Sequence, residues 1–140
     1  QISRLEVRRA VEVLAVELAC KRASQAQKQA MRDLASRLQG QFTLTEYIDT
    51  IRQTHSLILD AAANPYLGTL MLPLQGLSRR FWIVHARDES DDIGQGKDLH
   101  RKILLAIADG DAAGAALASR ALNDYLVEFA LAVISRQARR

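Results

Sequence analysis

The sequence predicts an all-α protein, a single antiparallel bundle of about six helices over residues 1–140. Apolar residues recur at helical spacing along most of the chain, and no segment has the alternation of a strand. Only 2 prolines and 7 glycines interrupt the 140 residues, whereas a β-sandwich would need many turns. With 49% hydrophobic and 25% charged residues, the composition is typical of one globular domain with its own core.

The first two helices are expected in the first forty residues. A broad apolar side predicts a helix from about residue 3 to residue 22. Ser24 can then cap a second helix, because its hydroxyl can accept from the free backbone N–H groups of the first turn. Gly40 is the expected end of this helix, since glycine readily terminates helices.

The third and fourth helices are separated by a strong boundary at Asn64-Pro65. Thr43 or Thr45 can start the third helix, which reaches residue 63; Glu46 lies three residues after Thr43, as in a capping box. Asn64 is a natural N-cap, and Pro65 fits the first helical position. The fourth helix is then expected to run to about residue 85, with a bend near Pro73 or Gly76.

A loop is predicted over the acidic, glycine-containing stretch RDESDDIGQGKD, residues 87–98. Asp91 or Asp92 can cap the fifth helix, or that helix begins nearer Asp98. Gly110 ends it, and Asp111 can cap a last helix over residues 112–136.

Charge and cysteine content exclude several classes of protein. The formal net charge of +3 is too small to indicate nucleic-acid binding by itself. The single cysteine, Cys20, excludes an internal disulfide and fits a cytoplasmic protein. No apolar run reaches membrane-spanning length, so no membrane contact is expected. The chain starts at Gln1 in helix-like sequence without an initiator Met, and we therefore expect a segment to precede it.

Two histidines are the best lead to function. His55 shares a helical face with Ile51 and Ile58, and His100 shares one with Ile103 and other apolar residues. Such a histidine points inward, where its imidazole needs a polar partner. Two of them predict a polar pocket inside an apolar bundle; alternatively, both are core histidines bonded to each other, to water or to backbone.

Four parts of the chain carry a resemblance to a known family. They are LEVRRAVEVLAVELACKRAS, HSLILDAAANPYL, LHRKILLAIADGDAAGA, and the pair LSRRFW and ALNDYLVEF. Their order and spacing resemble the C-terminal effector-binding (FCD) domain of GntR-type transcription regulators of the FadR subfamily. The resemblance implies a homodimeric module that senses a small carboxylate effector. It also implies an N-terminal winged helix that binds operator DNA, which this chain does not include.

The resemblance further implies a divalent metal ion such as zinc, held by an Asp, a His four residues later and two later histidines. His55 and His100 occupy the first two histidine positions. The carboxylate position is Ile51, and the last histidine position falls at Leu122 or Tyr125. Two imidazoles alone hold a divalent ion weakly, so no cofactor is certain.

Asp49 does not replace the missing carboxylate in this expectation. Six residues separate it from His55, which is about 600° of helical rotation and turns it well away from the histidine.

Three further residues are candidates for effector binding. The resemblance places Arg8 toward the effector, where a guanidinium can grip a carboxylate; alternatively it forms an exposed pair with Glu12. Asn123 and Tyr125 lie near the missing-histidine position, and Tyr125 either offers its hydroxyl or packs. Trp82 and Phe81, beside Arg79 and Arg80, can be read as a nucleic-acid platform, or as core or dimer contacts.

Three functions are compatible with these features. The first is a ligand-sensing domain of a bacterial transcription regulator, which is not an enzyme. The second is a helical metalloprotein or enzyme, which lacks a three-ligand set. The third is a ligand-free helical dimerisation adaptor, which apolar stripes alone would allow.

Overall fold

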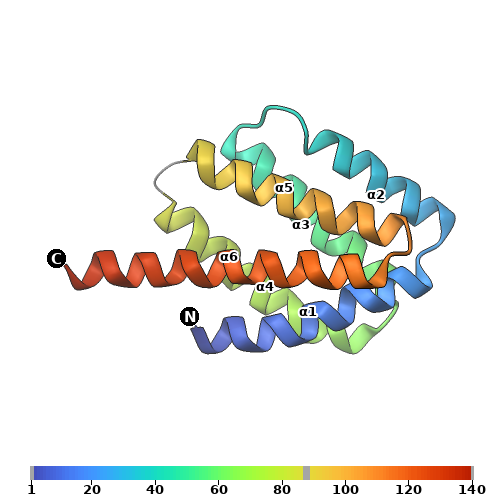
Figure 1. Cartoon of the computed structure of the whole chain (residues 1–140), viewed down its shortest axis with the longest axis horizontal. Helices are drawn as coiled ribbons and strands as arrows, with labels where there is room; N and C mark the ends of the chain where they lie inside the picture. Colours follow the sequence, from blue (N-terminus) through green and yellow to red (C-terminus); the bar gives the residue numbers. More distant parts are fainter. Residues whose placement is uncertain (1, 87–88, 140) are drawn as a thin grey trace.

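The computed structural model describes residues 2–86 and 89–139 and confirms the all-α expectation with six helices (Figure 1). They are α1 (Ile2–Arg22), α2 (Gln25–Arg37), α3 (Leu44–Ala62), α4 (Pro65–His85), α5 (Glu89–Ala108) and α6 (Ala112–Ala138). None of these helices is long and apolar enough to cross a membrane.

The expected caps form at most of the helix starts. Ser24 and Thr43 each complete a capping box, with Gln27 and Glu46 respectively, so Thr43 rather than Thr45 precedes α3. Asp111 accepts from the Gly114 N–H at the start of α6. Side-chain capping therefore fixes where these helices start, and the starts predicted from the sequence are confirmed.

Two predicted boundaries are wrong. The expected loop at 87–98 is helical from residue 89 onward, and residues 87–88 lie outside the described part. The candidate caps Asp91, Asp92 and Asp98 therefore lie inside α5. The chain is helical here and does not form the expected loop, because the turns of α5 around Ile93 and Gly96 pack inside the bundle. The second helix ends at Arg37 instead of Gly40, since its last turn closes with Gln39 and Gly40 bonding to Ser36 and Arg37.

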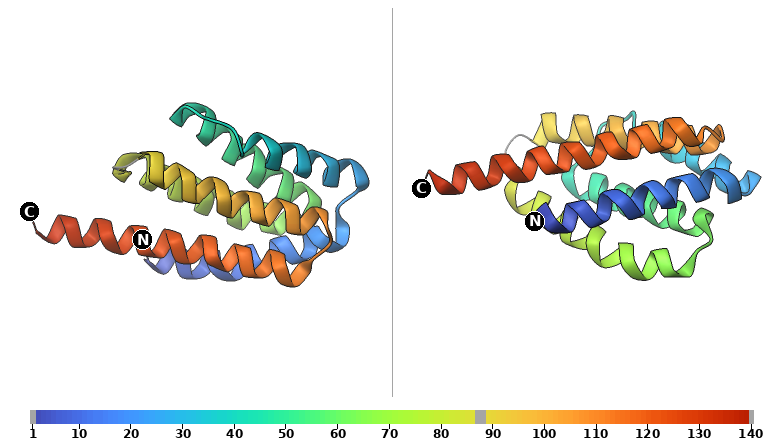
Figure 2. Two further views of the ribbon diagram at one scale, coloured as in Figure 1. Left: turned by 45° about the horizontal axis from the view of Figure 1, so that its top comes forward. Right: turned by 60° about the horizontal axis from the view of Figure 1, so that its bottom comes forward.

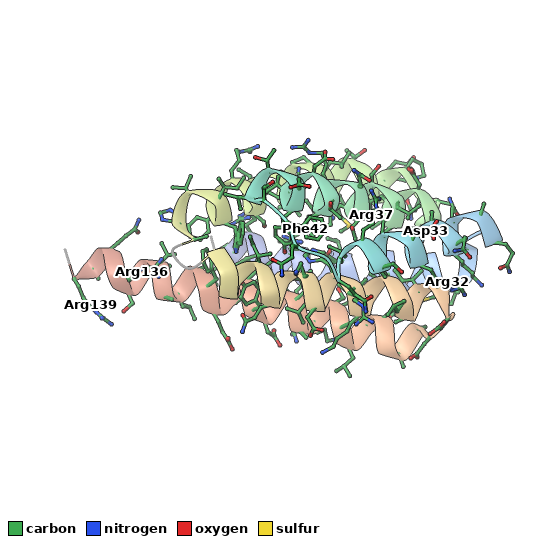
Figure 3. The ribbon with its side chains drawn as sticks, turned by 90° about the horizontal axis from the view of Figure 1, so that it is seen from above. Arg32, Asp33, Arg37, Phe42, Arg136 and Arg139 are labelled. Atoms are coloured by element: carbon green, nitrogen blue, oxygen red, sulfur yellow. The ribbon has the colours of Figure 1, made fainter. Side chains whose placement is uncertain are left out.

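The helices pack so that α1 lies along α6, α5 lies between α6 and α2, and α3 and α4 close the other side (Figure 2). The C-terminal end of α6 projects past the rest of the bundle and is followed by Arg139 (Figure 3). Arg136, near this end, still donates to the His85 carbonyl oxygen at the end of α4. The core is mostly aliphatic and includes Val16, Met31 and Leu104, which are fully buried. This arrangement brings the middles of five helices, all except α2, around one internal site.

Candidate functional site

A cavity of about 50 Å3 lies at the centre of the bundle. All helices except α2 contribute to its wall: Arg8 from α1; Tyr47, Ile48, Ile51 and His55 from α3; Ser78, Arg79 and Trp82 from α4; Gly96 and His100 from α5; Leu122, Tyr125 and Leu126 from α6. A cavity of this size holds more than one water molecule and less than a long acyl chain.

The two histidines meet in this cavity, as the sequence predicted. Their ring centroids are 5.5 Å apart, and both side chains are buried. His55 Nδ1 lies 3.2 Å from the Arg79 guanidinium, and His100 Nδ1 lies 2.7 Å from the Gly96 carbonyl oxygen. Neither Nε2 atom has a hydrogen-bond partner among the described residues. The rings are thus held from one side, and their second nitrogens remain available.

Burial disfavours the charged form of both imidazoles. It lowers the pKa of His55 well below its ordinary value of 6.5, and the nearby cations Arg8 and Arg79 lower it further. Burial lowers the pKa of His100 to about 4, against an opposing effect of its bond to Gly96. Both histidines are therefore neutral near pH 7 and add no positive charge to the cavity.

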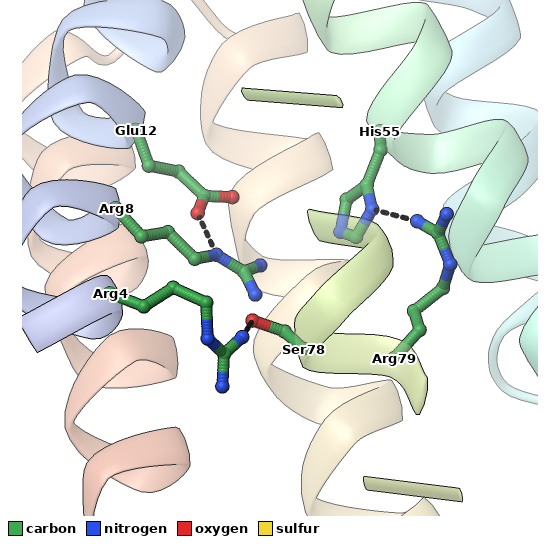
Figure 4. A network of polar contacts seen from close by, with 6 residues as sticks. All are labelled: Arg4, Arg8, Glu12, His55, Ser78 and Arg79. Atoms are coloured by element: carbon green, nitrogen blue, oxygen red, sulfur yellow. Dashed lines mark hydrogen bonds and ion pairs between the residues drawn. The ribbon is translucent and has the colours of Figure 1, made fainter. Parts of the chain in front are cut away.

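Arg79 is a cavity residue that the sequence did not single out. Its half-buried guanidinium donates to His55 across the cavity wall (Figure 4). Among the described residues it forms no ion pair with a carboxylate. Burial lowers the pKa of Arg79, and the neighbouring arginines Arg52, Arg8 and Arg80 lower it further. Arg79 is thus a partly desolvated cation among other cations.

Arg8 and Glu12 form a buried ion pair, which corrects the alternative of an exposed one. Arg8 Nε lies 2.7 Å from a Glu12 carboxylate oxygen, and the two side chains are 3% and 7% exposed. The pair is buried because it continues the inward spacing of Leu5, Ala15 and Ala19 along α1. One turn earlier, Arg4 donates to the Ser78 hydroxyl (Figure 4). Both bonds on α1 therefore face the cavity side of the bundle.

Aromatic residues form the other wall. Trp82 Nε1 donates to the Tyr125 hydroxyl at 3.3 Å, and the Tyr47 ring lies 5.7 Å from Trp82. Gly96 leaves room for the Tyr47 hydroxyl, since a methyl group there would overlap it. Trp82 is therefore a core residue at the cavity and does not form an exposed platform for nucleic-acid bases.

The remaining candidate, Asn123, is buried on α6 but is not among the cavity-lining residues. Its Oδ1 accepts no hydrogen bond from the described part of the chain.

Arg52, which flanks His55 in sequence, is exposed and lies 3.9 Å from Asp49. Arg52 and the next residue, Gln53, are both exposed, so this part of α3 faces solvent.

The donor set does not fit a divalent metal ion with three or more protein ligands. Ile51, Leu122 and Tyr125 all line the cavity where a carboxylate and a third histidine were expected. No group of three His, Cys, Asp or Glu residues comes together within residues 2–86 and 89–139. Two guanidinium groups lie beside the imidazoles instead, and their charge repels a cation. The cavity therefore presents fixed positive charge without the ligands for a metal.

A family model described as the FCD domain matches residues 3–124. This range contains every cavity-lining residue except Tyr125 and Leu126. A search of curated proteins finds no match to the chain.

Proposed function

Because this chain belongs to the FCD domain family, the effector-binding domain of GntR-type regulators, we propose that its central cavity binds a small organic acid. The attached regulator would be a bacterial, cytoplasmic transcription factor of the FadR subfamily, with a winged helix that binds operator DNA. The role is sensing, and no catalysis is required of the cavity. Residues 1–140 would act as one effector-binding and dimerisation domain.

One observation carries this proposal: the cavity has more positive than negative charge. Arg8 and Arg79 both line it, whereas Glu12 is the carboxylate that pairs with Arg8. The neutral histidines do not change this balance. A desolvated guanidinium without a carboxylate partner is a favourable site for an anion, and its planar donors match a carboxylate. The size of the cavity favours a small acid over a fatty acyl effector.

The same residues can couple effector binding to DNA binding. Arg8 lies on α1, the first helix of the chain, and Arg79 lies on α4. An anion between them would favour the arrangement in which α1 and α4 approach most closely. In a two-state regulator, that preference would shift the population of dimers that present their DNA-binding domains correctly.

We expect short carboxylates to bind and their neutral amides not to bind. Calorimetric titration with C2 to C6 monocarboxylates and the matching amides, in buffer containing EDTA, measures this directly. The variant Arg79→Gln should weaken carboxylate binding about 10- to 100-fold, because a charge-assisted hydrogen bond contributes about 1.5–3 kcal/mol. Its matched control is Arg120→Gln, which removes an exposed arginine of α6 that does not line the cavity. Equal binding of acid and amide, or no binding of any acid, would contradict the proposal.

The proposed homodimer has a candidate surface on α4. Leu70, Leu77 and Val84 are exposed and recur every seven residues, with Tyr66 four residues before them. Residues spaced in this way form one apolar line along a helix, which a second copy of the same helix can cover. Two antiparallel α4 helices would satisfy the symmetry of a dimer.

The variant Leu77→Glu should convert the dimer to a monomer, because it places two buried charges at the centre of this line. Sedimentation velocity at several protein concentrations measures the change. Leu117→Glu is the control, since Leu117 is also an exposed leucine but lies on α6. A dimer that survives Leu77→Glu would place the interface elsewhere.

A further inference from the structure

A second, smaller cavity of about 10 Å3 adjoins the central one, beneath the first turns of α1. The two cavities have three wall residues in common, Ser78, Trp82 and Leu126. The other walls of the smaller cavity are Arg4 and Leu5 of α1, Phe81 of α4 and Phe129 of α6. A cavity of this size has room for about one water molecule. The three shared side chains therefore separate the first turns of α1 from the central cavity.

Arg4 closes the outer side of this smaller cavity. Its guanidinium reaches from α1 to α4, where it donates to the Ser78 hydroxyl (Figure 4). Ser78 is buried, whereas Arg4 is only half-buried and is partly in contact with solvent. This hydrogen bond therefore joins a wall residue of the central cavity to a side chain at the surface of the protein.

The closed position of Arg4 has an electrostatic cost. Burial lowers the pKa of Arg4, and the Arg8 guanidinium one turn further along α1 lowers it again. The hydrogen bond to Ser78 offsets part of this cost, because a charged donor makes a strong bond. Opening requires the rotation of one long side chain and no movement of the backbone, and such rotations are fast. Arg4 is thus held in place by a contact that its own rotation can break.

We propose that small solutes enter the central cavity beneath the first turns of α1, past Trp82, and that Arg4 is the gate of this route. Ser78 holds the gate shut. When Arg4 turns outward, the smaller cavity opens to solvent and Trp82 becomes accessible at the entrance. The positive charge of Arg4 also attracts anions to this entrance. The gate determines how fast a solute reaches the cavity and leaves it, so the inference goes beyond the proposed carboxylate site.

Trp82 is a built-in reporter of this route. It is the single tryptophan of the chain, is 8% exposed and lies in the wall between the two cavities. Quenching of its fluorescence by acrylamide and by iodide measures how often a small solute reaches the indole ring. Neither quencher is a carboxylate, so the result does not depend on the proposed carboxylate site.

Arg4→Ala removes the gate, and Ser78→Ala releases it. Each should raise the bimolecular quenching constant at least about twofold, since access scales with the fraction of molecules in which the gate is open. Ser78→Asp should lower the constant below that of the unaltered protein, because a carboxylate holds a guanidinium more firmly than a hydroxyl does. Arg9→Ala is the matched control, as Arg9 is an exposed arginine of α1 that lines neither cavity. It should leave the constant unchanged.

The Ser78→Asp result separates a gate from a general loosening of α1, which could raise quenching but not lower it. Unchanged quenching in both Arg4→Ala and Ser78→Ala would overturn the proposal, as would an equal rise in Arg9→Ala. A rise in Ile48→Ala alone would overturn it too and place the entrance at this half-buried cavity residue of α3. If Ser78→Asp does not fold, amide hydrogen exchange of α1 in Arg4→Ala decides. Faster quenching with unchanged exchange supports the gate, and a parallel rise of both overturns it.

Discussion

Replacing Arg8 by methionine is expected to lower the free energy of unfolding by about 3–5 kcal/mol, the usual cost of breaking a buried ion pair on one side. Glu12 would keep its charge in a position that is 5% exposed, without the guanidinium 2.7 Å away. Urea denaturation followed by circular dichroism measures the loss. This pair lies beside the cavity, so its integrity also keeps the Arg8 cation in place.

The adjacent arginine provides the control. Arg9 is half-exposed and lies 3.7 Å from Asp124, so Arg9→Met should cost less than about 1 kcal/mol. The double variant Arg8→Met with Glu12→Leu should recover most of the lost stability, because it removes both charges. If Arg8→Met and Arg9→Met lowered the free energy of unfolding by the same small amount, the buried pair would not stabilise the fold as described.

Acidification is expected to destabilise the fold through the two histidines. A histidine whose folded pKa lies below its unfolded pKa binds more protons when unfolded, so stability is complete above the unfolded value and falls as pH drops below it. For His100 this window extends from 6.5 down to about 4. Between about pH 7 and pH 5 the linkage amounts to about 2 kcal/mol for His100, and His55 adds to it in the same direction.

Denaturant unfolding curves at a series of pH values measure this effect. His100→Gln should flatten the pH dependence, because glutamine does not titrate in this range. His85→Gln is the comparison variant, since His85 is only partly buried and its ring packs against Phe81 outside the cavity. A stability that stays constant from pH 7 to pH 5 would show that the imidazoles are not buried in a neutral form.

Local chemistry made most of the fold predictable. Ser24, Thr43, Asn64 and Asp111 each combine a capping side chain with a following apolar helix, and these two signals agree. The start of α5 was missed because Gly94 and Gly96 resemble loop residues in sequence. Only the packed bundle shows that Gly96 lies under the Tyr47 hydroxyl, where a larger residue does not fit.

The site was predictable only in part. The two histidines could be placed inward from the apolar residues around them, and the structure brings them together. Arg79 could not be found in this way, because α4 carries apolar residues on more than one side and its spacing does not distinguish Arg79 from Arg80. The burial of Glu12 follows the helical spacing of the buried residues of α1, but a pair of opposite charges four residues apart also has the pattern of an exposed ion pair.

The central claim is that Arg8 and Arg79 hold a carboxylate in the bundle core. Its most direct test is a titration of the 15N-labelled chain with lactate in EDTA, observing the arginine Nε–H resonances by NMR. The Arg79 and Arg8 signals should shift and saturate together at one lactate per chain, while the signal of the exposed Arg139, beyond the end of α6, stays in place. Shifts confined to Arg139 and other exposed arginines, or no saturation, would contradict this claim.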